Sequence, residues 1–110
     1  MHDTIPTDEG APVLDEDGLL RVGARWVAIP DAQIPVVKLL VERFGRVVRR
    51  DALVGAYVGA GHSGNEASVR SLLARVARRI EPVGLTLHTI RGRGVILSQQ
   101  QSDVVRGDAP

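Results

Sequence analysis

Apolar residues in the middle of the chain recur every three or four positions, the spacing that places side chains on one face of an α-helix. Over residues 31–44 this pattern predicts a first helix, whose regular part begins near Pro35 because proline is tolerated only in a first turn. Gly45 is suited to end that helix. Residues 50–58 predict a second helix, weakened by Gly55. The apolar positions of the two segments are Ile34, Val37, Leu40, Val41 and Phe44, then Leu53, Val54, Tyr57 and Val58.

A third helical segment, residues 66–80, has the clearest division into two faces. Its apolar face consists of Val69, Leu72, Leu73, Val76 and Ile80. Its opposite face carries small side chains and arginines, namely Ala67, Arg70, Ser71, Ala74, Arg75 and Arg78. Two caps compete for its first turn, a capping box of Ser63 with Glu66 and a single cap by Asn65. Pro82 and Gly84 end the segment.

Short apolar segments before and after the helices predict β-strands. The expected strands are residues 13–14, 19–22, 26–29, 85–90 and 95–98. The first three form a small antiparallel sheet that turns at Asp17-Gly18, and the last two form a hairpin around Arg91-Gly92-Arg93-Gly94. Val47-Val48 is expected as an extended link between the first two helices. Three helices followed by a basic hairpin predict an α/β (α+β) fold, the winged helix-turn-helix.

Length and composition fit one such domain. The chain has 110 residues, 44% of them hydrophobic, and no cysteine, so a disulfide framework and cysteine-ligated zinc are excluded. We expect the folded domain over residues 13–98, with residues 1–12 and 99–110 as disordered tails. No apolar run approaches the roughly 18 residues of a membrane helix, and we expect a cytoplasmic protein without membrane contact.

Charge divides the chain into an acidic start and a basic remainder. Residues 1–18 contain six carboxylates and no lysine or arginine, whereas residues 43–93 contain ten arginines against three carboxylates. Clustered arginines favour contact with phosphates or guanine edges, and a solvated basic surface is the alternative. The acidic tail is either solvated or lies over the basic face and competes with phosphate, in which case deleting residues 1–12 raises DNA affinity.

Three sequence motifs, in order, carry a resemblance to a known family. They are Gly45-Arg46-Val47-Val48 followed by Arg50-Asp51-Ala52-Leu53, then Val69, Leu73, Val76 and Ile80 followed by Glu81-Pro82, and finally Thr89-Ile90-Arg91-Gly92-Arg93-Gly94. Over about residues 13–98 the chain resembles the effector domain of OmpR/PhoB-type response regulators, which are bacterial transcription regulators. A receiver domain with its phosphorylatable aspartate is not expected. Where the family has a capping Ser or Thr, an acidic residue and an aromatic, this chain has Arg49, Arg70 and Val95.

The resemblance implies a binding mode on double-stranded DNA. The third helix enters the major groove, Arg91 approaches the minor groove, and Thr89 and Arg75 contact the backbone or bases. The candidate DNA-contacting residues are Arg50, Arg70, Ser71, Ala74, Arg75, Arg78, Thr89, Arg91 and Arg93. Among these, Arg70, Arg75 and Arg78 are expected to anchor phosphates, while Ser71 or Ala74 makes small contacts to bases. Arg46 and Arg49 also lie near the start of the second helix, where free backbone amides can meet a phosphate.

Other chemistry receives little support. The Gly59–Gly64 segment matches a dinucleotide-binding fingerprint in its letters, but it follows a helix rather than a strand, so we interpret it as a connector. The histidines are scattered, and no catalytic residue, metal or cofactor is expected. Trp26, Phe44 and Tyr57 are expected in the core.

We therefore predict a DNA-binding transcriptional regulator, not an enzyme. A lone module binds DNA weakly, so we expect a homodimer or tandem binding. The alternative is an adaptor that contacts RNA polymerase or another regulator. In the family that this chain resembles, the loop that corresponds to the segment around His62 is the part that can contact the polymerase.

Overall fold

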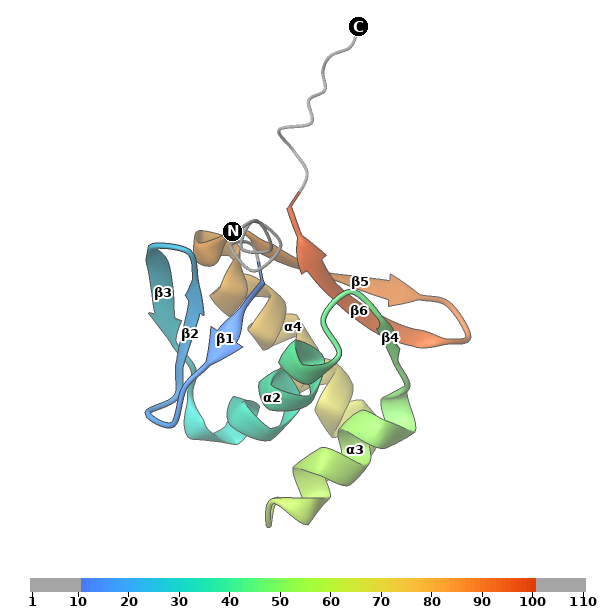
Figure 1. Ribbon diagram of the computed structural model, residues 1–110. Coiled ribbons are helices and arrows are strands. Elements are labelled where there is room, and N and C mark those ends of the chain that lie inside the picture. Colours follow the sequence, from blue (N-terminus) through green and yellow to red (C-terminus); the bar gives the residue numbers. More distant parts are fainter. Residues whose placement is uncertain (1–10, 101–110) are drawn as a thin grey trace, which may run out of the picture.

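The computed structural model describes residues 11–100, in which a group of helices lies between two three-stranded antiparallel sheets (Figure 1). The elements in order are β1 (Val13–Leu14), β2 (Leu19–Val22), β3 (Arg25–Ala28), the 3-10 turn η1 (Asp31–Gln33), α2 (Ile34–Glu42), β4 (Val47–Val48), α3 (Arg50–Gly59), α4 (Glu66–Ile80), the 3-10 turn η2 (Glu81–Val83), β5 (Leu85–Ile90) and β6 (Gly94–Gln99). This order of an antiparallel sheet, three helices and a hairpin confirms the predicted fold class.

The predicted tails lie largely outside the described residues. Where the structure does describe them, Pro12 is buried and Gln99 is the last residue of β6. The backbone N–H of Gln100 donates to the carbonyl of Gly84 at 2.8 Å. The second strand of the hairpin therefore runs one residue beyond its expected end.

The amino-terminal sheet has the order β1-β2-β3, in which each strand pairs with the next along the chain. Its third strand begins at Arg25, one residue before the predicted start. Leu20 pairs with Val27 on the inner face, so the next pair, Arg21 with Trp26, points outward. The prediction that Trp26 is a core residue is therefore wrong, because its side chain is 60% exposed.

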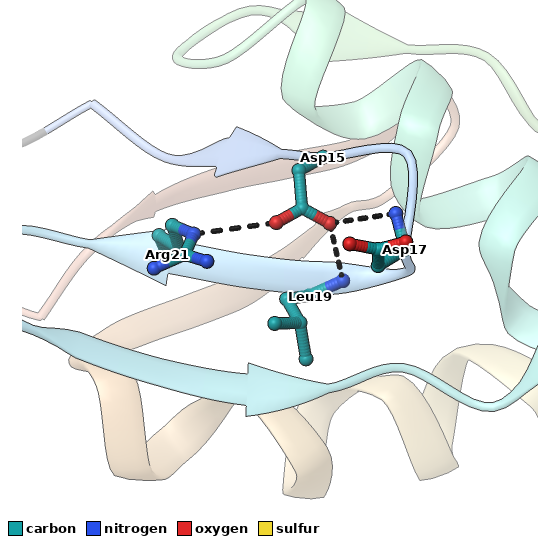
Figure 2. Close-up of polar contacts among 4 residues, drawn as sticks. All are labelled: Asp15, Asp17, Leu19 and Arg21. Carbon is teal, nitrogen blue, oxygen red and sulfur yellow. Dashed lines mark hydrogen bonds and ion pairs between the residues drawn. The ribbon is translucent and has the colours of Figure 1, made fainter.

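The turn between β1 and β2 is held by the carboxylate of Asp15 (Figure 2). One oxygen accepts hydrogen bonds from the backbone N–H groups of Asp17 at 2.8 Å and Leu19 at 3.0 Å, and the other accepts from Arg21 Nε at 3.3 Å. These bonds hold the pKa of Asp15 below its usual value, the N–H of Leu19 contributing most. Gly18 completes the turn with a φ of 82°.

The first helical segment is divided into η1 and α2, with Pro35 in the first turn of α2 as predicted. The regular helix ends at Glu42, two residues before the predicted end, so Phe44 lies beyond it. Gly45 has the expected left-handed conformation, with a φ of 83°, and its N–H donates to the carbonyl of Leu97 at 2.9 Å. This bond ties the end of α2 to the carboxy-terminal sheet.

One hydrophobic core joins the helices and both sheets. All five residues predicted for the apolar face of α4 are buried within it. Leu53 from α3 is fully buried, whereas Phe44 and Tyr57 pack half-buried at its margin and Val58 is exposed. The buried members are Leu20, Ile29, Val36, Val37, Leu40, Val48, Leu53, Val69, Leu72, Leu73, Val76, Ile80, Val83, Leu85, Val95 and Leu97.

The carboxy-terminal sheet has the order β4-β6-β5, so the expected extended link is a strand. Val47 pairs with Ile96 and Val48 with Val95, which fixes the hairpin of β5 and β6, hereafter the wing, beside the start of α3. Gly94, the first residue of β6, lies against the backbone of Val48 and Arg49. A Cβ atom at Gly94 would overlap the carbonyl group of Val48, and its φ of 147° is one that side-chain-bearing residues rarely adopt. Glycine is thus required at this crossing.

Candidate nucleic-acid interface

A groove of about 920 Å³ lies between the tip of the wing and the first turns of α3 and α4. Figure 1 shows the wing extending outward beyond the end of β4, with α3 on the same side of the molecule. The groove is lined by Arg49, Arg50, Asp51, Val54, Gly64, Asn65, Glu66, Thr89, Ile90, Arg91, Gly92, Arg93 and Gly94. Segments far apart in the sequence thus form its two walls, helix starts on one side and the wing on the other.

Four arginines and two carboxylates line this groove, so its formal charge is positive. On the helix wall each arginine faces a carboxylate, with 3.7 Å between Arg49 Nε and Asp51 Oδ1 and 3.8 Å between Arg50 Nη1 and Glu66 Oε2. On the wing wall, Arg91 and Arg93 are exposed and form no ion pair with any residue between 11 and 100. The wing arginines are therefore available to an external anion.

The outward face of α4 carries the remaining candidates. The side chains of Arg70, Ser71, Ala74, Arg75 and Arg78 are all exposed there, opposite the buried apolar face. This arrangement presents arginines around small side chains, as the sequence predicts. A helix with such a face can lie in the major groove of DNA, which admits one α-helix.

The start of α4 is fixed by Asn65. Its side-chain oxygen accepts from the backbone N–H of Ser68 at 3.1 Å and from Ser68 Oγ at 3.3 Å. Of the two caps that the sequence leaves open, the structure has Asn65 and not Ser63. Glu66 therefore does not act in a capping box, and its carboxylate instead forms an ion pair with Arg50.

The connector between α3 and α4 is folded against α3. The rings of Tyr57 and His62 are stacked with centroids 4.7 Å apart and planes 13° from parallel. Gly64 packs on the same aromatic ring, because a Cβ there would lie 3.0 Å from Tyr57 Cε2. Tyr57 thereby holds the connector that leads into the cap of α4.

The structure brings four of the nine candidate residues together in the groove, namely Arg50, Thr89, Arg91 and Arg93. The five candidates on α4 lie on its exposed face and outside the groove lining. Sequence reasoning does not identify Asp51 and Glu66 as part of the site. The available signal is a carboxylate in the first turn of each helix, but their approach to arginine depends on how α3 and α4 pack.

Within residues 11–100, no three His, Asp or Glu side chains gather closely enough to hold a metal ion. In the same part of the chain, no helix has the length and apolar character needed to cross a membrane.

The three helices, of which α4 exposes one face, together with the basic wing define a winged helix-turn-helix domain. No protein-family model matches the chain. Among curated proteins, the heme response regulator HssR of Staphylococcus saprophyticus is 31% identical over 77 residues, which are 68% of this chain and 34% of HssR. The chain spans about a third of the length of this relative.

Solved structures of response-regulator domains share the fold. The carboxy-terminal domain of the nisin resistance regulator NsrR has a TM-score of 0.70 and 22% identity, covering 82% of this chain and 94% of that domain. The Klebsiella pneumoniae RstA DNA-binding domain in complex with the RstA box has a TM-score of 0.62 and 22% identity, covering 81% and 92%. The AdeR DNA-binding domain in complex with an intercistronic region has a TM-score of 0.65 and 16% identity, covering 81% and 95%.

These structures confirm the resemblance to OmpR/PhoB-type effector domains that the sequence motifs indicate. The fold that the chain shares with these domains is the winged helix-turn-helix.

Proposed function

We propose that this chain binds double-stranded DNA in the cytoplasm and regulates transcription. In this proposal α4 enters the major groove and the wing arginines reach toward the adjacent minor groove. The observation that carries it is the groove beside α4, in which Arg91 and Arg93 have no internal partner within the described residues. The solved complexes of RstA and AdeR with DNA support the same assignment.

The distribution of side chains suggests how affinity and sequence preference are divided. Arg70, Arg75 and Arg78 are exposed on α4 and serve chiefly as phosphate anchors. Ser71 and Ala74 lie on the same face and are short enough to let the helix approach base edges closely. Thr89 and Arg50 line the groove and add contacts to the backbone.

A single module of this size buries about 600 to 1,000 Å² on DNA, which gives weak binding by itself. Binding as a homodimer or in tandem on repeated half-sites supplies the missing affinity. Contact with RNA polymerase belongs to the same proposal, since a regulator bound beside a promoter lies within reach of the enzyme.

The decisive experiment measures fluorescence anisotropy of labelled duplex DNA across a salt series for the full chain and for Arg75→Ala with Arg91→Ala. We expect the double variant to bind at least about tenfold more weakly, and the slope of log K against log salt to fall by about 1.8, which is about 0.9 for each phosphate that the variant no longer neutralises. Arg43→Ala is the matched control, because Arg43 is an exposed arginine outside the groove and outside α4.

Unchanged DNA affinity in the double variant would overturn the proposal. Absence of DNA binding by the unaltered chain at low salt would instead favour the adaptor alternative, in which the partner is a protein.

A further inference from the structure

The two ion pairs of the groove differ in how far water reaches them. Arg49 and Asp51 have side chains that are 74% and 78% exposed, so solvent screens their interaction. The side chain of Arg50 is only 31% exposed, and its partner Glu66 is 60% exposed. Arg50 is therefore the more sheltered cation of the helix wall, and Glu66 is the group that holds it.

Glu66 is not required for the cap of α4. Asn65 already accepts the hydrogen bond from the N–H of Ser68, and Glu66 is the only carboxylate in the helix. Its charge favours the start of a helix modestly, as any acidic residue in a first turn does. The specific contact that the structure gives to Glu66 is thus the one with Arg50.

A carboxylate in this position opposes DNA in two ways. It occupies the guanidinium of Arg50, which a phosphate would otherwise contact, and it places a negative charge in a groove proposed to receive a negatively charged backbone. Both effects act on every DNA sequence equally, because phosphate contacts carry no sequence information.

We infer that Glu66 competes with DNA phosphate for Arg50 and thereby weakens binding to all sequences alike. The ratio between the affinities for two DNA sequences is then the same with and without the carboxylate, because the penalty is common to both. This inference rests on the proposed DNA-binding function of the groove.

The test compares the full chain with Glu66→Gln on a duplex of mixed sequence by anisotropy at several salt concentrations. Glutamine keeps the size of the side chain and removes its charge. We expect binding to become about two- to fivefold tighter, the range typical of a partly exposed ion pair. The salt slope should steepen by about 0.9, because Arg50 is then free to neutralise one phosphate. Glu81→Gln, at an exposed carboxylate just beyond α4 and outside the groove, is the matched control and should change neither value.

A second pair of variants tests whether the effect passes through Arg50. In an Arg50→Ala background the gain from Glu66→Gln should shrink, because the guanidinium to be released is absent. On duplexes enriched from a random pool by the unaltered chain, Glu66→Gln should tighten binding by the same factor as on duplexes of mixed sequence, because phosphate contacts carry no sequence information.

Weaker binding by Glu66→Gln would overturn the inference, since Glu66 would then be orienting Arg50 for phosphate. An unchanged affinity, or a gain that persists fully without Arg50, would also overturn it. These outcomes differ from failure of the proposed function, in which neither the unaltered chain nor Glu66→Gln binds duplex DNA.

Discussion

The two sheets of this domain have the same number of strands and differ in how they are held together. In the amino-terminal sheet, strands that follow each other along the chain pair, and a side chain, Asp15, fixes the turn. In the carboxy-terminal sheet, β4 pairs with β6 across more than forty residues of sequence, and the absence of a side chain at Gly94 allows the backbones to meet. One sheet is secured by a polar contact and the other by close approach.

The comparison separates residues that stabilise the fold from residues free to bind. Arg21 in the first sheet donates to Asp15, so its charge is used within the protein. Arg91 and Arg93 at the wing have no ion pair among the described residues, so their charges do not serve the fold. Loss of the contact between Asp15 and Arg21 should therefore alter stability, and loss of Arg91 or Arg93 should alter binding.

The largest effect is expected at Gly94. Gly94→Ala places a Cβ against the carbonyl of Val48 in a backbone conformation unfavourable for alanine, and neither strand can move without breaking the pairing of β4 with β6. We expect a loss of about 3 kcal/mol or more of unfolding free energy, measured by urea denaturation. A loss below about 1 kcal/mol would show that the wing is not held by this crossing.

Gly18→Ala is the matched change in the amino-terminal sheet. Its φ is also positive, at 82°, but the Cβ would lie 3.2 Å from Ile34 Cδ1, the movable end of a side chain. The left-handed conformation costs alanine about 1 to 2 kcal/mol, partly offset by the smaller entropy of the unfolded chain. We expect a loss of about 1 kcal/mol in the same denaturation experiment. Equal losses for the two glycine variants would contradict the distinction between the sheets.

Acidification should weaken the amino-terminal sheet through Asp15. Its pKa is lower in the folded protein than in the unfolded chain, mainly because it accepts the N–H of Leu19. The contribution to stability is therefore complete above the unfolded pKa of about 3.9 and is lost as pH falls through the lowered folded value. Thermal unfolding between pH 5 and 2 should show that the difference in Tm between the unaltered chain and Asp15→Asn narrows with acid. A constant difference would argue against this linkage.

The smallest effect on stability is expected at Trp26. Because its side chain is 60% exposed, Trp26→Thr should change the unfolding free energy by less than about 1 kcal/mol, and threonine suits a strand. Denaturant unfolding followed by circular dichroism checks this, since the variant removes the tryptophan in the sequence. A loss above about 2 kcal/mol would indicate that the Trp26 side chain is packed in the core and contradict its exposed position.

The sequence predicts most accurately the features that depend on residues close together along the chain. The bounds of α4 and its five buried residues agree with the structure because one amphipathic pattern specifies them. The sequence misplaces Trp26 because Trp26, Val27 and Ile29 are all apolar, so alternation along the strand does not tell which face points inward. The pairing of Leu20 with Val27 decides it, and it turns Trp26 outward. Val47 and Val48 are too few to show a period, so their pairing with β6 is visible only in three dimensions.

In the candidate site too, some features follow from local sequence patterns and others depend on how the elements pack together. Periodicity places Arg70, Arg75 and Arg78 on the exposed face of α4, and the turn sequence places Arg91 and Arg93 at the hairpin tip. The contact between Arg50 and Glu66 joins the first residues of two helices, and its existence depends on the packing of α3 against α4. Local patterns identify the arginines, but only the assembled fold identifies what they face.

The short strand β4 also determines how this domain can be divided into parts. The wing is one hairpin in sequence, but its inner strand is paired on its other edge by Val47 and Val48, and position 94 accepts only glycine against that backbone. A hairpin grafted alone onto another scaffold would leave one edge of β6 unpaired and lose the surface on which it rests. A working chimera must therefore carry residues 47–50 together with residues 85–99 as a single exchangeable unit.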